Sequence, residues 1–137
     1  MSKKEFRLTK SEMELMEHLW KSNRAMTKAE IVLTAENRSW KASYTFRIIN
    51  FLLEKGAIKV AGRVLSGRRY ARLFLPNITR DEYYVMLLQE NPILTPASIT
   101  GLVGSVLSRA TPEERSDLVT ELEELISQFK EEEAMDA

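Results

Sequence analysis

The sequence contains no cysteine among its 137 residues. This absence excludes disulfide bonds, thiolate nucleophiles and thiolate metal sites, and it favours a reducing, cytoplasmic location. Histidine is almost as scarce, because His18 is the only one, and we expect it to face solvent on a helix. No nucleophile, base and orienting residue occur at a spacing typical of catalysis. The sequence therefore predicts neither an enzyme nor a metal or cofactor site.

The sequence also lacks an apolar run long enough to cross a membrane. Its longest uncharged run, residues 91–108, holds two prolines and two glycines, which make it too interrupted to span lipid. The basic start is followed by SEMELMEHLW, where a signal peptide would require an apolar core. We therefore expect a cytoplasmic protein with no membrane insertion, and we interpret residues 91–108 as a loop followed by a helix.

Each half of the chain has little charge of one sign. Residues 1–80 hold 17 Lys and Arg against 7 Asp and Glu, a net charge of +10, whereas residues 81–137 hold 3 against 13, a net charge of −10. A basic module joined to an acidic one is typical of a protein in which one part binds a polyanion and the other stays off it. A merely polar surface is the alternative that charge alone leaves open.

A threonine followed three residues later by glutamate stands at four candidate helix starts, at Thr9, Thr27, Thr79 and Thr111. This spacing is that of the capping box, in which the Thr hydroxyl accepts from the third helical amide and the Glu carboxylate accepts from the Thr amide. Each box predicts the start of a helix. The first three helices of the chain are predicted over residues 10–22, 28–37 and 43–55.

The third helix is predicted to end at Gly56, where a left-handed C-cap favours glycine. Two alternating segments follow, residues 58–64 and 69–75, around the turn sequence Leu65-Ser66-Gly67-Arg68, and they predict a β-hairpin. Three helices and a hairpin predict a winged helix-turn-helix domain over residues 1–78. Residues 79–137 show helical patterns only, so the predicted fold is mainly α with a small β-hairpin.

Residues 79–137 are predicted to form a helical dimerisation domain with a frayed acidic C-terminus. About sixty residues spread over three helices are too few to bury a core of their own. Apolar residues at spacings of four and three in the last helix favour a coiled-coil-like contact with a second copy, although a helix packed on its own domain is left open. The candidate dimerisation residues are Leu102, Val106, Leu118, Leu122, Leu125 and Phe129.

The basic charge of residues 41–74 is explained if this unit binds DNA, because a helix-turn-helix places its third helix in the major groove. The candidates at or just before that helix are Lys41, Ser43, Tyr44, Arg47 and Asn50. Arg47 can chelate a guanine and Asn50 can pair with an adenine. Phe46 and Phe51 are expected to pack against the hairpin, with a contact to a thymine methyl as the alternative for one of them.

The hairpin, or wing, is expected to run beside the DNA phosphates. Its candidate phosphate contacts surround the turn and are Arg63, Arg68, Arg69 and Arg72, and Lys59 extends the same set along the strand. The alternative is a hairpin that exposed arginines merely keep in solution.

The segment LTKSEMELMEHLW, Leu8 to Trp20, closely resembles the opening helix of the penicillinase repressor family, which includes methicillin-resistance regulators and copper-responsive repressors. TKAEIV is similar to the second helix of that family, RIINFLLEKGAI to its recognition helix, and LPNITRDEYY to its passage into the dimerisation region. The most specific residues of the resemblance are Leu8, Thr9, Glu12, Met16, Leu19, Trp20 and Lys55-Gly56. The resemblance implies a homodimeric repressor that binds a double-stranded DNA operator of two inverted half-sites.

Two departures from the family concern the inducing signal. Relatives linked to β-lactam sensing are cleaved at an Asn-Phe bond, whereas the corresponding place here is Ser105-Val106. Copper-responsive relatives use a C-terminal cysteine cluster that this chain lacks. A membrane sensor peptidase or another inducer is left open as a partner. The operator sequence is not implied, because the start of the recognition helix departs from the family pattern at Tyr44, Thr45, Phe46 and Arg47.

A second function is compatible with the same residues. A winged helix can act as a protein-protein interaction module that docks an acidic partner, with Tyr44, Phe46 and Phe51 as its apolar anchor.

Overall fold

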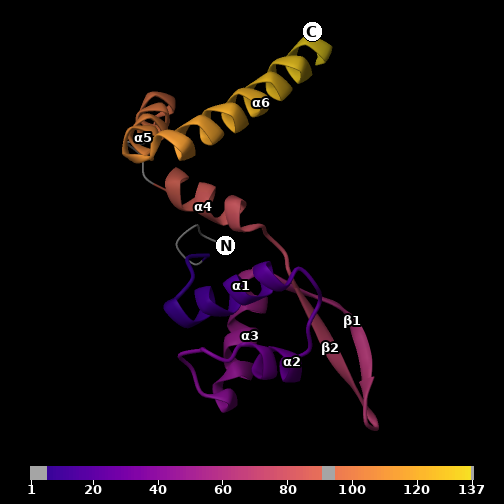
Figure 1. The fold of residues 1–137 in the computed structure, drawn as a ribbon. Helices are drawn as coiled ribbons and strands as arrows, with labels where there is room; N and C mark the ends of the chain where they lie inside the picture. Colours follow the sequence, from indigo (N-terminus) through magenta and orange to yellow (C-terminus); the bar gives the residue numbers. More distant parts are fainter. Residues whose placement is uncertain (1–5, 91–94, 137) are drawn as a thin grey trace. The chain divides into compact units, whose positions relative to one another are not determined.

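The computed structural model describes residues 6–90 and 95–136. Its elements, in chain order, are α1 (Lys10–Ser22), α2 (Lys28–Thr34), the 3-10 turn η1 (Ala42–Tyr44), α3 (Thr45–Lys55), β1 (Ile58–Ser66), β2 (Arg69–Pro76), α4 (Arg80–Gln89), α5 (Pro96–Arg109) and α6 (Pro112–Asp136) (Figure 1). The predicted fold class, mainly α with a small β-hairpin, is confirmed. None of the described helices is long and apolar enough to cross a membrane.

The contacts between residues divide the chain into two compact units, Met1–Asn91 and Pro92–Ala137. The first unit therefore holds α4 in addition to the winged helix, whereas the sequence predicts a boundary after residue 78. Part of the predicted 91–108 loop, residues 91–94, lies outside the described residues.

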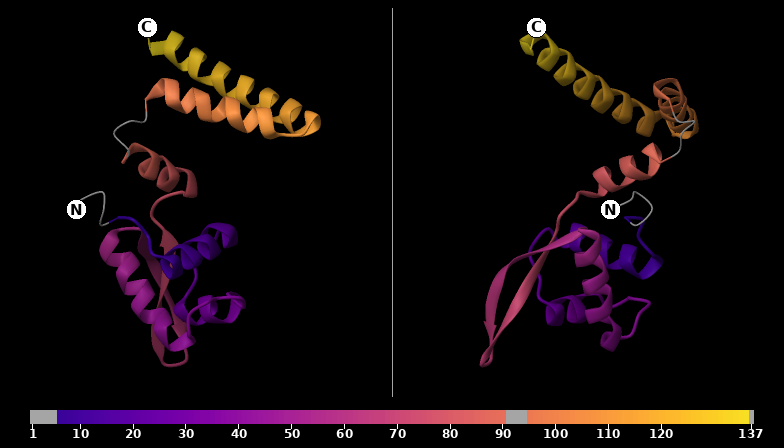
Figure 2. Two further views of the ribbon diagram at one scale, coloured as in Figure 1. Left: turned by 90° about the vertical axis from the view of Figure 1, so that its left-hand side faces the viewer. Right: turned by 180° about the vertical axis from the view of Figure 1, so that it is seen from behind.

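Helices α1, α2 and α3 lie together in the first unit (Figure 2). They share one hydrophobic core, to which β1 and β2 contribute Ile58 and Phe74. Helix α3 contributes Thr45, Ile48, Ile49 and Leu52, each at most 1% exposed, at the spacing that places them on one face of a helix. The indole of Trp40 donates a 2.9 Å hydrogen bond to the Thr45 hydroxyl, so the one polar side chain in this inward stripe is satisfied. The inward face of α3 is fixed by these contacts, and its opposite face is turned away from the core.

All four predicted capping boxes are formed. In α1, for example, the Thr9 amide donates to the Glu12 carboxylate over 2.8 Å, and the Glu12 amide donates to the Thr9 hydroxyl over 3.4 Å. Gly56 ends α3 with φ of +77°, the left-handed cap that the sequence indicates.

Helix α2 is shorter than predicted, because it ends at Thr34 rather than at residue 37. The guanidinium of Arg38 donates to the carbonyls of Val32 and Ala35 at 2.9 and 3.1 Å. Val32 belongs to the last turn of α2, whose carbonyls have no partner within the helix, and Ala35 is its C-cap. A side chain beyond the helix thus takes over its C-terminal acceptors.

Strands β1 and β2 form an antiparallel hairpin whose last pair is Ser66 with Arg69. The turn is therefore shorter than predicted and has Gly67 and Arg68 at its centre, with Gly67 at φ of +66°, which glycine tolerates best. The register shifts between Val60 and Gly62, so the strand carries a bulge, which bends and twists a hairpin.

Helix α4 is attached to the winged helix by Tyr83, which is 4% exposed. The Tyr83 hydroxyl accepts a 3.0 Å hydrogen bond from the Leu8 amide, and its ring centroid lies 6.4 Å from that of Trp20. The Trp20 indole donates to the carbonyl of Ile78 over 2.9 Å. These contacts explain why α4 belongs to the first unit.

The second unit is a hairpin of α5 and α6 (Figure 2). Arg115 of α6 donates hydrogen bonds to the carbonyls of Leu107 and Ala110 at 2.8 and 3.1 Å, and so caps the end of α5. Helix α6 continues to Asp136, so residues 131–136 belong to the helix, and the frayed acidic end stays a prediction. Residue 137 lies outside the described residues.

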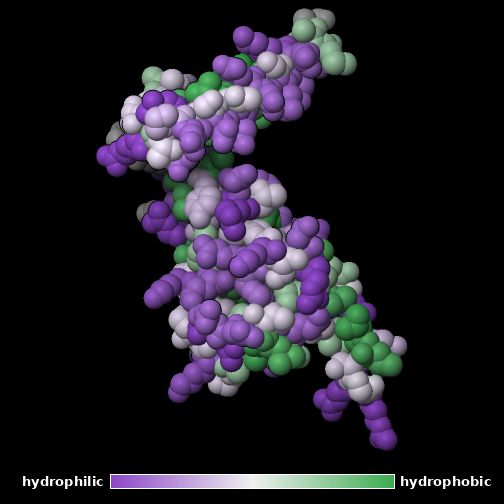
Figure 3. Space-filling view, viewed as in Figure 1, coloured by the Kyte–Doolittle hydropathy of each residue, from purple (hydrophilic) through white to green (hydrophobic). Residues whose placement is uncertain are grey.

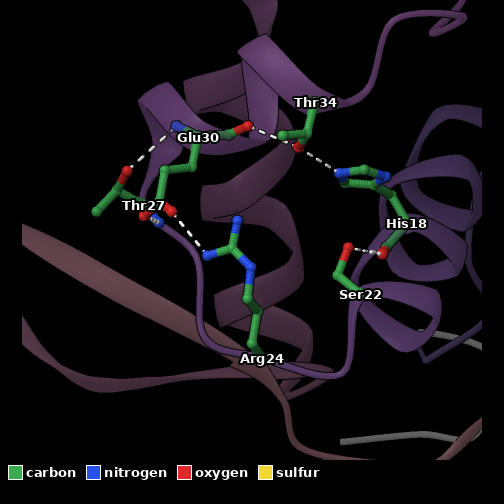
Figure 4. Close-up of polar contacts among 6 residues, drawn as sticks. All are labelled: His18, Ser22, Arg24, Thr27, Glu30 and Thr34. Carbon is green, nitrogen blue, oxygen red and sulfur yellow. Dashed lines mark hydrogen bonds and ion pairs between the residues drawn. The ribbon is translucent and has the colours of Figure 1, made fainter.

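His18 is half-buried rather than solvent-facing, which corrects the sequence prediction. Its Nε2 atom lies 2.7 Å from the Thr34 hydroxyl, which in turn donates to the Glu30 carbonyl over 2.7 Å (Figure 4). Because that hydroxyl proton is already donated, the histidine is the donor to Thr34. His18 therefore ties α1 to the end of α2.

Candidate nucleic-acid interface

The exposed face of α3 follows from the burial of the opposite face. Successive residues turn by about 100° around a helix, so Arg47, Asn50 and Glu54 form a stripe opposite the core. Phe46 borders this stripe on one side and Phe51 on the other. Lys41 and Ser43, which precede α3, are exposed, as are Tyr44 and Arg47, and Asn50 is half-buried. The predicted residues are therefore gathered at the start of α3 and along its free face.

Arg47 is placed by the aromatic ring of Tyr44. Its guanidinium carbon lies 5.7 Å from the Tyr44 ring centroid, a distance at which cation and ring attract. Tyr44 closes the 3-10 turn η1, directly before α3. The turn thus supports the side chain that the sequence analysis favours for reading a guanine.

Phe46 is 51% exposed and Phe51 is 41% exposed. The ammonium of Lys28, at the start of α2, lies 5.7 Å from the Phe46 ring centroid. The prediction that both rings pack away against the wing is therefore wrong for Phe46, whose neighbour is α2. The sequence could not show this, because the contact depends on how α2 packs beside α3.

The wing carries its four arginines at two levels along the hairpin. Arg63 and Arg72 are direct cross-strand partners, and the Arg72 guanidinium carbon lies 5.2 Å from the Phe74 ring centroid. Like charges directly opposite each other destabilise a hairpin. Arg68 and Arg69 are exposed at the turn and form the second level.

Between these levels lies an apolar pair that the sequence analysis did not single out. Leu65 and Tyr70 are cross-strand partners and are 64% and 70% exposed. Figure 3 shows the projecting wing as largely hydrophobic along its length with hydrophilic side chains at its tip. The alternating pattern of the two strands could have predicted the exposure of this pair. It places both residues on a hairpin that no other predicted element covers.

The ion pairs of the described residues join Arg7 to Glu90, Arg24 to Glu30 and Lys55 to Glu12. Within the described residues, none of the cations of the wing or of the exposed face of α3 is neutralised by a carboxylate. The surface thus keeps its positive charge, which would attract a polyanion.

The second unit has an exposed apolar surface. None of its described residues, 95–136, is fully buried. The predicted dimerisation residues Leu118 and Leu122 are half-buried. The others are about half exposed and comprise Leu102 at 48%, Val106 at 56%, Leu125 at 48% and Phe129 at 59%.

Residues 8–133 match the family model described as penicillinase repressor. None of the curated proteins matches the sequence. Among solved structures, a zinc-responsive MarR family member from Lactococcus lactis, ZitR, is 17% identical with a TM-score of 0.41, over 90% of this chain and 77% of that one. MepR, a transcription regulator of the Staphylococcus aureus multidrug efflux pump MepA, is 13% identical with a TM-score of 0.44, over 92% of this chain and 83% of that one.

Proposed function

This chain belongs to the penicillinase repressor family, and we propose that it represses transcription as a homodimer bound to an operator of two inverted half-sites. In each copy α3 enters the major groove, where Arg47 and Asn50 contact base edges. Lys41, Ser43 and Tyr44 contact the DNA beside them. The wing contacts phosphates through Arg63, Arg68 and Arg69.

One observation supports the DNA contact above all others. The free face of α3 and the wing carry cations with no carboxylate partner among the described residues. Two of them, exposed Arg63 and half-buried Arg72, are cross-strand partners in the hairpin. A protein that had no anionic ligand would gain stability by losing this repulsion. A DNA backbone supplies the missing negative charge.

The pairing of two copies is supported by the second unit. Two helices without a buried side chain leave apolar residues in water, and burying these against a second copy is favourable by about 25 cal/mol per Å². Domains 1–78 and 79–137 keep their proposed roles in DNA binding and dimerisation, with α4 attached to the first. The acidic charge of the second region keeps it off the DNA.

The alternative, a module that docks an acidic protein through an apolar anchor, is less well supported. Such an anchor is expected to be a continuous cluster at the centre of an interface. Phe46 and Phe51 lie instead on opposite sides of the polar stripe formed by Arg47 and Asn50. The rings therefore flank a polar reading surface and do not form one patch.

Binding to DNA fragments selected from a random duplex pool tests the proposal. We expect one inverted repeat to be enriched, and we expect log affinity to fall with log salt by about 0.9 for each neutralised phosphate. Enrichment of no sequence, or an affinity independent of salt, would contradict it. Sedimentation of the same sample should show two protein chains per duplex.

A further inference from the structure

An exposed phenylalanine at the start of a DNA-reading helix requires an explanation. Phe46 is the second residue of α3 and is 51% exposed, so half of an apolar ring is left in water. It is absent from the hydrophobic core and from the partly buried residues that pack against that core. Within the described residues, the Phe46 ring therefore contributes nothing to the hydrophobic core.

The position of Phe46 limits what its ring can meet. A recognition helix presents its N-terminal residues to base edges, and Phe46 lies one residue before Arg47 on the border of the exposed stripe. The apolar group that protrudes into the major groove is the C5-methyl of thymine, and phenylalanine is among the side chains that contact it.

We propose that Phe46 reads one thymine in each half-site by packing its ring against the C5-methyl group. This inference rests on the proposed function, because it places α3 in the major groove. The methyl distinguishes thymine from cytosine, which has only hydrogen at the same ring carbon. Phe46 is thus a specificity-determining residue beside the polar contacts of Arg47 and Asn50.

Lys28 gives this contact a fixed place. Its ammonium lies 5.7 Å from the centroid of the Phe46 ring, where the attraction between cation and ring restrains both side chains. An ammonium at the edge of the groove is attracted to a phosphate. The pair therefore combines a phosphate contact from α2 with a methyl contact from α3, and the phosphate contact sets how far the ring reaches.

The experiment removes the methyl group alone. A duplex selected from a random pool by the full-length protein is resynthesised with each thymine in turn replaced by deoxyuridine, which keeps all base-pair hydrogen bonds. At one thymine position of the half-site, we expect deoxyuridine to weaken binding by the unaltered protein. The loss should be about fourfold for each methyl group removed, which corresponds to the free energy of transferring one apolar carbon out of water. Phe46→Ala should bind more weakly and should not distinguish thymine from uracil there.

Phe51→Ala is the matched control, because it removes another exposed ring from the opposite border of the same helix. It should keep the preference for thymine at that position. Circular dichroism of both variants establishes that the winged helix is folded.

The outcomes separate this inference from the proposed function. If a duplex is selected but uracil weakens the unaltered protein at no position, or weakens Phe46→Ala equally, the thymine contact is overturned while DNA binding stands. If no duplex is selected, the proposed function and the contact fall together. If Phe51→Ala and not Phe46→Ala abolishes the thymine preference, the reading residue is Phe51 and the inference is overturned.

Discussion

The Nζ atom of Lys55, the last residue of α3, lies 2.5 Å from the Glu12 carboxylate of α1. Glu12 is 2% exposed, and the same carboxylate oxygen accepts from the Thr9 amide in the capping box of α1. Lys55 also donates to the Arg7 carbonyl over 3.1 Å. The pair thus joins the start of α1 to the end of α3, the helix proposed to read DNA, and it involves two of the residues on which the family resemblance depends.

Lys55→Met should destabilise the protein by about 3 kcal/mol, because it leaves the charge of Glu12 buried without its partner. Urea unfolding followed by circular dichroism measures the change. The double variant Glu12→Gln with Lys55→Met removes both charges and should recover part of the loss. Equal losses in the single and double variants would mean that the ion pair does not hold α3 to α1.

The sequence predicts α3 and the capping boxes well because their causes are local. The inward spacing of Ile48, Ile49 and Leu52, the Thr and Glu three residues apart, and Gly56 at the C-cap all act within a few residues of each other. Packing against the other helices of the first unit then stabilises the helix that these residues already favour.

The remaining features depend on residues that are distant in the chain. Helix α2 ends early because Arg38 folds back on it, His18 is half-buried because Thr34 meets it, and α4 joins the winged helix because Tyr83 meets Trp20. Periodicity cannot show such contacts, since it describes one segment at a time. The sequence placed Arg47 and Asn50 on the free face of α3, because that face follows from the periodicity of one helix. It misplaced the ring of Phe46, because the neighbour of that ring belongs to α2.

Arg63→Gln should stabilise the wing while weakening DNA binding. It removes the repulsion between cross-strand partners Arg63 and Arg72, which is worth up to about 1 kcal/mol. If Arg63 neutralises one phosphate per copy, the slope of log affinity against log salt falls by about 0.9 for each copy. Thermal unfolding and a salt series of gel shifts measure the two effects.

Arg109→Gln, the same substitution in α5, is the control for Arg63→Gln and should leave the salt dependence unchanged. An Arg63→Gln variant with unaltered DNA affinity would show that the wing does not contact phosphates at this level.

Arg47→Ala and Arg68→Ala should weaken DNA binding in different ways. Arg47 is expected to contact a base, so its loss should cost about 1 to 3 kcal/mol on the selected duplex and relax the preference at one position. Arg68 lies at the wing turn and is expected to contact a phosphate, so its loss should weaken selected and random duplexes about equally. Competition between the two kinds of DNA distinguishes these results, and equal behaviour of the variants would refute the division of roles.

Leu122→Asp combined with Leu125→Asp should separate the two copies, because each substitution places a carboxylate in the proposed apolar contact. Operator affinity should fall with the dimer, since a single half-site offers too few contacts. Sedimentation and gel shifts measure the two losses, and circular dichroism shows whether the helices survive.

Gly101→Ala in α5 also tests the proposed dimer contact, because its effect on stability should differ in sign between an isolated helix and a packed dimer. A Cβ atom at this position would meet nothing within 4 Å in the single chain, so alanine should stabilise an isolated helix by about 1 kcal/mol. If a partner helix packs closely there, alanine should instead weaken the dimer. A more stable dimer would show that this side of α5 is not in the interface.

The stability of the first unit should depend on the protonation of His18. Burial, followed by the nearby charges of Lys21 and Arg24, lowers the pKa of His18 below the ordinary value of about 6.5. Between the lowered pKa and about 6.5, the unfolded chain binds a proton that the folded chain does not, so the free energy of unfolding falls as pH falls through this window. Above about pH 6.5 the contribution is complete.

His18→Gln isolates this effect, because glutamine can donate to the Thr34 hydroxyl but does not titrate. Urea unfolding of both proteins from about pH 5 to pH 8 should give curves whose difference changes only in the histidine window. The unaltered protein should lose more stability on acidification than the variant, since protonation charges a half-buried ring and adds a third positive charge beside Lys21 and Arg24. Parallel curves would show that His18 has the same pKa in the folded and unfolded chains, and a steeper loss in the variant would give the shift the opposite sign.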